Sequence, residues 1–329
     1  MRRRDILKLA ALSAAAAALR RSVAALPLSV SSPAPGPIPI IDAHIHLFDP
    51  LRPGGVPWPE KTDTAIYKPA LPDRYVGETA ALGIVGAIAV EASPLASDNQ
   101  WLLNVARDHP IIVGVVGDLV PGSPAFLNDL ERLHGNQLFL GIRYGNLWNR
   151  DLAADLENPG FVDGLKALAA AGLVLETANP DPRLIGAIVE AAERVLDLRI
   201  VIDHLPHAPV PSEPDPQKEY WDNLRLLAGS PRVFVKLSEI PVRVNGKLMT
   251  DPHFYQPSLD AIWDIFGEDH LLYGSDWPNS DHVASYAQTF AIVRGYVARK
   301  DAVAREKFFW KNSIAAYRWE RRRSNQPVL

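Results

Sequence analysis

The stretch "IDAHIHLFDP", residues 41–50, places two histidines one residue apart at the end of a short apolar run. On a β-strand, residues i and i+2 point to the same face of the sheet. The imidazoles of His44 and His46 should therefore lie side by side, with Asp42 one step earlier on the same face. Such a pair either has a structural role within a sheet or forms part of an active site. The other polar residues in the sequence distinguish these two possibilities.

The run that carries these histidines is the first of eight short runs rich in β-branched and apolar residues. Stretches with helical periodicity lie between the runs, as in "PRLIGAIVEAAERVL" at residues 182–196. Near-continuous apolar strands that alternate with helices are typical of a parallel sheet. Eight such units predict an α/β fold in the form of a closed (β/α)8 TIM-like barrel. The runs occupy residues 37–46, 84–91, 111–118, 138–144, 172–177, 198–204, 232–238 and 270–276.

The length and composition exclude several classes of protein. The chain has 329 residues, of which 47% are hydrophobic, so it can bury a sizeable core. An open doubly wound sheet is the alternative to the barrel, but no Gly-x-Gly-x-x-Gly motif follows the first run. A formal net charge of −4 with scattered Lys and Arg does not suit nucleic-acid binding. The chain lacks cysteine, and no apolar run of about 18 residues predicts a membrane span.

The N-terminus has the features of an export signal. Arg3 and Arg4 precede an apolar pair, and the weakly hydrophobic stretch "LAALSAAAAAL" follows at residues 9–19. This pattern is typical of twin-arginine signals. We therefore expect an export signal over residues 1–24, a Pro/Ser-rich linker over 25–36 and a single barrel domain over 37–329. The expected location is periplasmic or secreted, with the export machinery as a partner. The alternative is an alanine-rich amphipathic helix with a basic start.

Polar residues end every one of the eight predicted strands. In a barrel of this kind, the carboxyl ends of the strands converge on one mouth, where active sites lie. Burying so many polar groups in one place is costly unless they serve a function. We therefore expect one pocket, with His44 and Asp276 less than about 12 Å apart across so small a barrel. The residues at the strand ends are His44, His46, Glu91, Asp118, Arg143, Glu176, Asp203, His204, Ser238, Glu239 and Asp276.

Several short blocks in this order resemble the amidohydrolase superfamily. More narrowly, they are similar to its branch of sugar-acid lactonases, which includes L-fuconolactonases and L-rhamnonolactonases. The similarity runs from about residue 40 to residue 317, nearly the whole chain after the predicted linker. The blocks are "HIH" at 44–46, "WLL" at 101–103, "IIVGVVGD" at 111–118, "GIRY" at 141–144, "IDH" at 202–204, "VKLS" at 235–238 and "YGSDWP" at 273–278.

The resemblance implies a role for each of the four central residues. His44 and His46 would either hold one divalent metal ion, such as Zn²⁺, together with Asp276, or hydrogen-bond the substrate carbonyl. His204 would assist at that carbonyl, and Asp276 would be the general base that activates water. The better-known metal-dependent members place a histidine or a carboxylated lysine on strand four or five. Here those strands end in Arg143 and Glu176, which disfavours a binuclear centre.

The same residues suit the chemistry of opening a lactone, the expected small-molecule substrate. The reaction needs a nucleophilic water, a base and positive charge at the developing oxyanion. Arg143 can grip a carboxylate or a pair of hydroxyls. We expect Arg143, Glu91, Glu176 and Trp277 to contact the substrate. Each has a structural alternative: Arg143 can form an ion pair with Glu91 or Glu176, and a tryptophan in a barrel loop can simply pack.

Two other functions compete with the lactonase. The first is a metal-dependent decarboxylase of an aromatic or muconate-type acid, but such relatives place a histidine on strand five, which "LVLETANP" lacks. The second is a non-catalytic periplasmic binder of a carboxylic acid, which would not need Asp276 beside the histidines. One loop is also expected: residues 207–221 contain too many prolines for a helix and are predicted to cover the mouth.

Overall fold

The computed structural model describes residues 37–329, which form one compact unit. The export signal expected over residues 1–24 and the linker over 25–36 lie outside the described residues. Within the described range, no helix combines the length and apolar character needed to cross a membrane.

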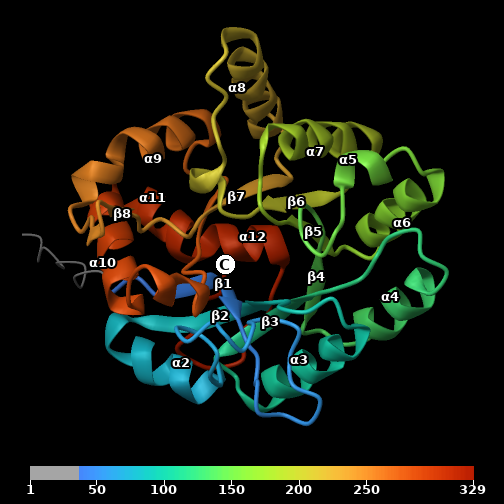
Figure 1. The fold of residues 1–329 in the computed structure, drawn as a ribbon, viewed down its shortest axis with the longest axis horizontal. Helices are drawn as coiled ribbons and strands as arrows, with labels where there is room; N and C mark the ends of the chain where they lie inside the picture. Colours follow the sequence, from blue (N-terminus) through green and yellow to red (C-terminus); the bar gives the residue numbers. More distant parts are fainter. Residues whose placement is uncertain (1–36) are drawn as a thin grey trace, which may run out of the picture. The chain divides into compact units, whose positions relative to one another are not determined.

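Eight parallel strands follow one another around a nearly closed barrel in the order in which they occur in the chain (Figure 1). The predicted (β/α)8 fold is therefore confirmed. The eighth strand is β10, because a two-stranded antiparallel hairpin, β8 (Arg243–Val244) and β9 (Lys247–Leu248), is inserted after the seventh. The barrel strands are β1 (Ile40–His46), β2 (Ile84–Val90), β3 (Ile112–Gly117), β4 (Phe139–Arg143), β5 (Val174–Thr177), β6 (Arg199–Ile202), β7 (Val233–Leu237) and β10 (Leu271–Tyr273).

The barrel closes between β1 and the segment that follows β10. The backbone N–H of Asp276 donates to the carbonyl of His44 at 2.9 Å, and that of His46 donates to the carbonyl of Trp277 at 2.7 Å. Gly274 allows this approach, because a Cβ there would lie 2.9 Å from the Cβ of His44. The backbone that carries the histidine pair is thus joined directly to the backbone that carries Asp276.

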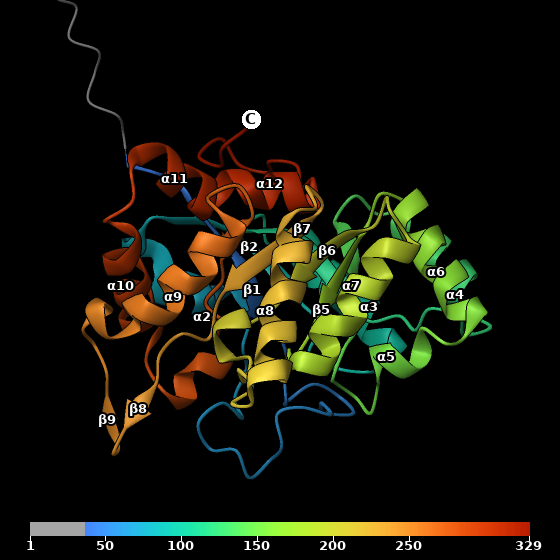
Figure 2. The ribbon, with the colours of Figure 1, turned by 90° about the horizontal axis from the view of Figure 1, so that it is seen from above.

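Helices surround the barrel and bury their apolar faces against the strands (Figures 1 and 2). In α7, for example, the Asp181 side chain accepts from the N–H of Leu184 and Pro182 occupies the first turn, both favourable features of a helix start. The helices are α2 (Pro72–Thr79), α3 (Ala96–Asp108), α4 (Phe126–His134), α5 (Leu152–Asp155), α6 (Pro159–Ala170), α7 (Pro182–Arg194), α8 (Pro214–Ala228), α9 (Pro252–Phe266), α10 (Tyr286–Val297), α11 (Ala302–Glu306) and α12 (Asn312–Tyr317).

Helix α8 corrects the prediction of a continuous loop over residues 207–221. Its first turn contains Pro214 and Pro216, and helical structure continues to Ala228. Proline is tolerated in a first turn because the N–H groups there have no partner within the helix. Only residues 208–213 lack regular structure in this segment.

The two ends of the barrel differ in character. Figure 2 shows α12 at one end and the loop that follows β1 at the opposite end. Trp310, Tyr317 and Trp319 belong to an apolar cluster with residues from inside the barrel, such as Ile41 and Val201. The C-terminal segment therefore fills the amino-terminal end of the barrel and leaves the carboxyl ends of the strands free to form a site.

Candidate active site

A cavity of about 210 Å³ lies at the carboxyl ends of the strands. It draws side chains from segments that follow β1, β2, β4, β5, β6, β7 and β10, so it is the mouth expected of the fold. Its lining residues are His46, Trp58, Glu91, Ala92, Arg143, Leu147, Trp148, Asn179, His204, Glu239, Asp276 and Asn279.

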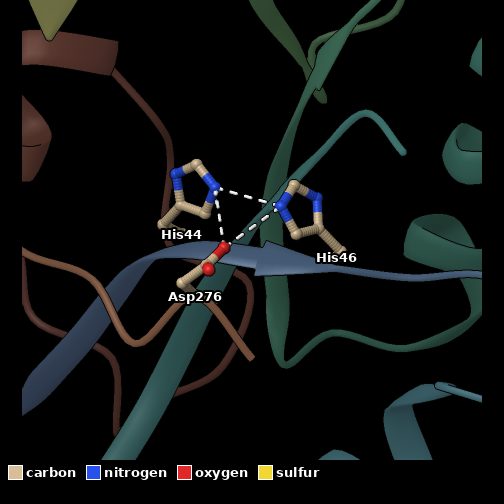
Figure 3. A group of neighbouring side chains, drawn as sticks. All are labelled: His44, His46 and Asp276. Carbon is tan, nitrogen blue, oxygen red and sulfur yellow. Dashed lines mark hydrogen bonds and ion pairs between the residues drawn. The ribbon is translucent and has the colours of Figure 1, made fainter. Parts of the chain in front are cut away.

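Two histidines and an aspartate meet at the floor of this pocket (Figure 3). His46 and Asp276 line the cavity, and the completely buried His44 contacts both of them. The Nε2 atoms of His44 and His46 are 3.2 Å apart. The Asp276 Oδ1 atom lies 3.2 Å from Nε2 of His46 and 3.5 Å from Nε2 of His44. Nε2 of His204 is 3.9 Å from the same oxygen. The structure thus brings together the four central residues found in the sequence, and all four are buried.

Neighbouring groups orient each of these side chains. Nδ1 of His46 donates to the Val90 carbonyl at 3.1 Å, because a carbonyl oxygen can only accept. Nδ1 of His204 is 2.8 Å from the Ser238 hydroxyl. The Asn279 amide donates to Oδ2 of Asp276 at 2.7 Å. Asn279 was not singled out in the sequence, although it lies only three residues after Asp276.

The electrostatics keep the Asp276 carboxylate ionised and the imidazoles of His44 and His204 neutral. Burial favours a higher pKa for Asp276, but the imidazoles of His204, His46 and His44 outweigh it and hold that pKa below its usual range. Burial lowers the pKa of His204 to about 4, against the opposing effect of Asp276. Burial and the charge of Lys236 lower the pKa of His44. At neutral pH the group therefore combines a proton acceptor, Asp276, with the uncharged imidazoles of His44 and His204.

The pocket also concentrates unusual backbone conformations. Of the eight non-glycine residues with positive φ in residues 37–329, five line the pocket. Such conformations cost free energy and persist where the surrounding structure enforces them, often at functional sites. The five residues are Trp148, Asn179, His204, Glu239 and Asp276.

Arg143 lies in the pocket wall, where acidic groups already pair with it. Its Nε donates to Oδ2 of Asp203 at 3.0 Å, and its Nη1 lies 3.7 Å from Oε1 of Glu91. Glu91 in turn accepts from the Trp148 indole N–H at 3.1 Å. The ion pair with Glu91 weighed from the sequence is therefore present, while both residues still line the cavity. Trp58 and Trp148 provide aromatic surfaces beside them.

Glu176 does not line the pocket, which corrects its expected contact with substrate. It is completely buried below the floor, where Oε1 is 2.6 Å from Nζ of Lys236 and Oε2 accepts from the Tyr317 hydroxyl at 2.6 Å. Burial and the charge of Asp203 raise the pKa of Glu176 to about 7. Its partner Lys236 lies on β7. A lysine within the apolar run "VFVKL" was the available signal.

Trp277 and Asp118 also lie outside the pocket. Trp277 is completely buried; its ring packs edge-on against Tyr75, and its Nε1 donates to Glu78 at 3.2 Å. Its expected contact with substrate is therefore wrong: the indole faces the helix layer. Oδ1 of Asp118 instead forms an ion pair with Arg150 at 2.5 Å.

The atoms at the pocket floor fit a metal ion. Zinc bonds of about 2.0–2.1 Å in a tetrahedron place neighbouring ligand atoms about 3.4 Å apart. The three separations among His44, His46 and Asp276 are 3.2–3.5 Å. Oδ1 of Asp276 is buried and accepts no hydrogen bond, as expected for an atom that meets a cation or a reacting water. This buried group can therefore bind a metal ion.

Comparisons with known proteins agree with this geometry. The model of the family described as Amidohydrolase matches residues 41–319. The chain is 30% identical over 293 residues to a protein named L-fucono-1,5-lactonase from Burkholderia ambifaria, and the match covers 87% of this chain and 98% of that protein. A protein of the same name from Burkholderia multivorans is 28% identical over 289 residues, covering 84% of this chain and 94% of that protein.

A solved structure shows the same architecture. An amidohydrolase from Burkholderia multivorans with bound zinc superimposes with a TM-score of 0.73 at 25% identity. The match covers 86% of this chain and 100% of that one.

Proposed function

Because the chain belongs to the amidohydrolase family, we propose that this enzyme opens a lactone of a sugar acid or of a related carboxylic acid. The observation that carries the proposal is the buried Asp276 carboxylate, which meets three imidazoles at the floor of a polar pocket. Two relatives that match nearly along their whole length are named L-fucono-1,5-lactonase, which supports the same reaction class.

The positions of these side chains support a hydrolytic mechanism. Asp276 takes a proton from water as the water oxygen attacks the lactone carbonyl carbon. His44 and His204 donate hydrogen bonds to the carbonyl oxygen as it gains charge, and Arg143 adds positive charge from the pocket wall. The ring C–O bond then breaks, and the proton held by Asp276 passes to the departing ring oxygen. The product is the open-chain hydroxy acid.

The pocket suits an uncharged, hydroxylated substrate. Arg143 already pairs with Asp203 and Glu91, so its remaining N–H groups and the Glu91 carboxylate can receive hydroxyls without leaving a charge unpaired. Trp58 and Trp148 can cover the apolar face of a ring. These contacts replace those expected from Glu176 and Trp277.

A zinc ion held by His44, His46 and Asp276 would add a Lewis acid and a more acidic water at the same place. The proton transfers and hydrogen bonds of the hydrolysis use only side chains of the protein. The positive charge at the carbonyl oxygen can come from a metal ion or from Arg143 without changing the reaction class.

The test is a pH-indicator screen of the purified protein against a panel of sugar lactones, with Asp276→Asn as the matched variant. We expect at least one lactone to open, with a loss of about 10²–10⁴-fold in kcat for Asp276→Asn, the range for a lost general base. Undiminished turnover by the variant would overturn the role of Asp276. Release of CO2 from aromatic or muconate-type acids, without lactone opening, would instead favour the decarboxylase. Binding without turnover would favour the carboxylic-acid binder.

Metal content is measured on the same sample before and after exhaustive chelation. Loss of activity with recovery on adding zinc would assign the carbonyl polarisation to a metal ion. Full activity at substoichiometric metal would assign it to the histidines and Arg143, and Arg143→Met should then lower kcat by about 10²-fold or more.

A further inference from the structure

Lys236 is the one ammonium group among the buried residues beneath the pocket floor within residues 37–329, and the steps above do not use it. Its side chain is completely buried. Nζ lies 2.6 Å from Oε1 of Glu176, 3.0 Å from Oδ1 of Asp203 and 2.9 Å from Nδ1 of His44. An ammonium group has three N–H donors, and here it faces three acceptors.

These contacts determine which nitrogen of His44 carries the hydrogen. Nζ lies 3.0 Å from the buried carboxylate of Asp203, and a buried carboxylate is costly without a cation beside it, so Lys236 carries a positive charge. A cationic ammonium can only donate, so Nδ1 of His44 must accept. The hydrogen of the neutral imidazole therefore resides on Nε2. In His46, by contrast, Nδ1 carries a hydrogen, which it donates to the Val90 carbonyl.

We propose that Lys236 is a positioning residue that fixes which nitrogen of His44 carries the hydrogen, by occupying Nδ1 and so placing the hydrogen on Nε2. Nε2 faces Nε2 of His46 at 3.2 Å and Oδ1 of Asp276 at 3.5 Å, so His44 presents a donor where the reaction takes place. The catalytic consequence rests on the proposed function; the position of the hydrogen does not. A metal ion at Nε2 of His44 would have to displace this hydrogen.

Removing Lys236 should move the hydrogen. In Lys236→Met, Nδ1 of His44 loses its donor and faces two carboxylates, Oδ1 of Asp203 at 3.3 Å and Oε1 of Glu176 at 3.5 Å. The hydrogen should then transfer to Nδ1, where it can be donated. Arg143→Met is the matched control, because it removes a second buried cation beside Asp203 without touching His44.

The experiment is ¹⁵N–¹H correlation spectroscopy of the imidazoles in the ligand-free, chelated protein, with His44 identified by comparison with His44→Asn. We expect a protonated Nε2 and an unprotonated Nδ1 in the wild type and in Arg143→Met, and the reverse in Lys236→Met. With a lactone substrate, Lys236→Met should lower kcat by about 10²-fold and change KM much less, as for a lost oxyanion donor.

The wild-type spectrum alone can overturn the proposal, so the proposal does not depend on whether Lys236→Met folds. A hydrogen on Nδ1 of His44 in the wild type would refute it, as would an unchanged hydrogen position in a folded Lys236→Met. Because the spectra are recorded without substrate, failure to find a lactone that opens would count against the proposed function and leave this inference standing.

Discussion

At the scale of single residues, Glu239 is the pocket group whose charge state most depends on its surroundings. It lines the cavity directly after β7, and Oε2 lies 3.9 Å from Nδ1 of His204. Burial and the nearby charge of Asp276 raise its pKa to about 8, although Arg143 opposes them. Asp203 adds to the rise, and His282 acts against it. A protonated carboxyl group therefore stands beside the ionised Asp276 at neutral pH.

This arrangement predicts a loss of activity on the alkaline side. Above about pH 8, ionised Glu239 places a second negative charge near the developing oxyanion, so kcat/KM for lactone opening should fall. Glu239→Gln stays neutral and should keep the profile flat through that range. The measurement is a pH–rate profile corrected for spontaneous lactone opening. An identical alkaline fall in the variant would show that another group is responsible.

The same group should affect stability with a defined sign. Between its ordinary pKa of 4.5 and about 8, Glu239 keeps its proton in the folded state and loses it in the unfolded state. The contribution of Glu239 to stability therefore decreases as pH rises through this window. Glu239→Gln should remove that dependence, which denaturant unfolding at pH 5 and pH 8 can measure alongside the rate profile.

At the scale of elements, the closure between β1 and β10 positions the catalytic residues relative to one another. The two segments approach so closely that a Cβ on Gly274 would lie 2.9 Å from the Cβ of His44 and 3.2 Å from that of Ser238. Of these two neighbours, His44 is itself an active-site histidine, and the Ser238 hydroxyl contacts Nδ1 of His204. The packing that closes the barrel between β1 and β10 therefore also sets the positions of the active-site histidines.

Gly274→Ala should damage both stability and activity. Overpacking of this kind costs about 1–3 kcal/mol of unfolding free energy. A shift of His44 should lower kcat about 10-fold or more, since misplacement by about 1 Å can cost about 10²-fold. Gly77→Ala is the control, because Gly77 is exposed in α2 with no atom within 4 Å of the added Cβ. This change should increase the free energy of unfolding by about 0.5–1 kcal/mol, because alanine is favoured over glycine within a helix. Equal effects of the two variants would contradict this account.

At the scale of the whole molecule, the C-terminal helix supports the active site from below. Tyr317 of α12 donates to the buried Glu176, which pairs with Lys236, which contacts His44. A chain of buried contacts thus links the last helix to the first strand. The amino-terminal end of the barrel and the pocket floor therefore depend on each other.

Tyr317→Phe should expose this dependence. The variant leaves a buried carboxylate oxygen without its donor, which should cost about 1–3 kcal/mol of unfolding free energy. Tyr296→Phe is a suitable control, because its acceptor, Asp260, is about 34% exposed and can bind water instead. Denaturant unfolding of both variants should show the larger loss for Tyr317→Phe, and the reverse order would argue against a supporting role for α12.

We also propose that the protein is exported by the twin-arginine route. The proposal rests on Arg3, Arg4 and the weakly apolar stretch at residues 9–19. Replacing both arginines by lysine should leave the protein in the cytoplasm of a bacterial expression host, as judged by fractionation. Recovery in the periplasm at the unmodified level would show that the segment has another role.

The sequence by itself determined the strands and the candidate residues at their ends. Strand identity follows from local patterns, and a (β/α)8 barrel brings the strand ends together whatever the details of packing. For this reason His44, His46, His204 and Asp276 could be placed in one site before the structure was considered. The same local reasoning failed for α8, because a count of prolines does not show that Pro214 and Pro216 occupy a first turn.

Only the tertiary structure decided how deep each polar side chain lies and with which group it pairs. Alternation along a strand separates inward from outward residues, but it does not assign an inward residue to a layer of the barrel. Glu176 therefore lies below the floor with Lys236, while Arg143, its register partner on β4, reaches the pocket. Trp277 faces the helix layer. These outcomes depend on side chains that are far apart in the sequence. Their distances to one another, and therefore their electrostatic interactions, are set only when the barrel closes.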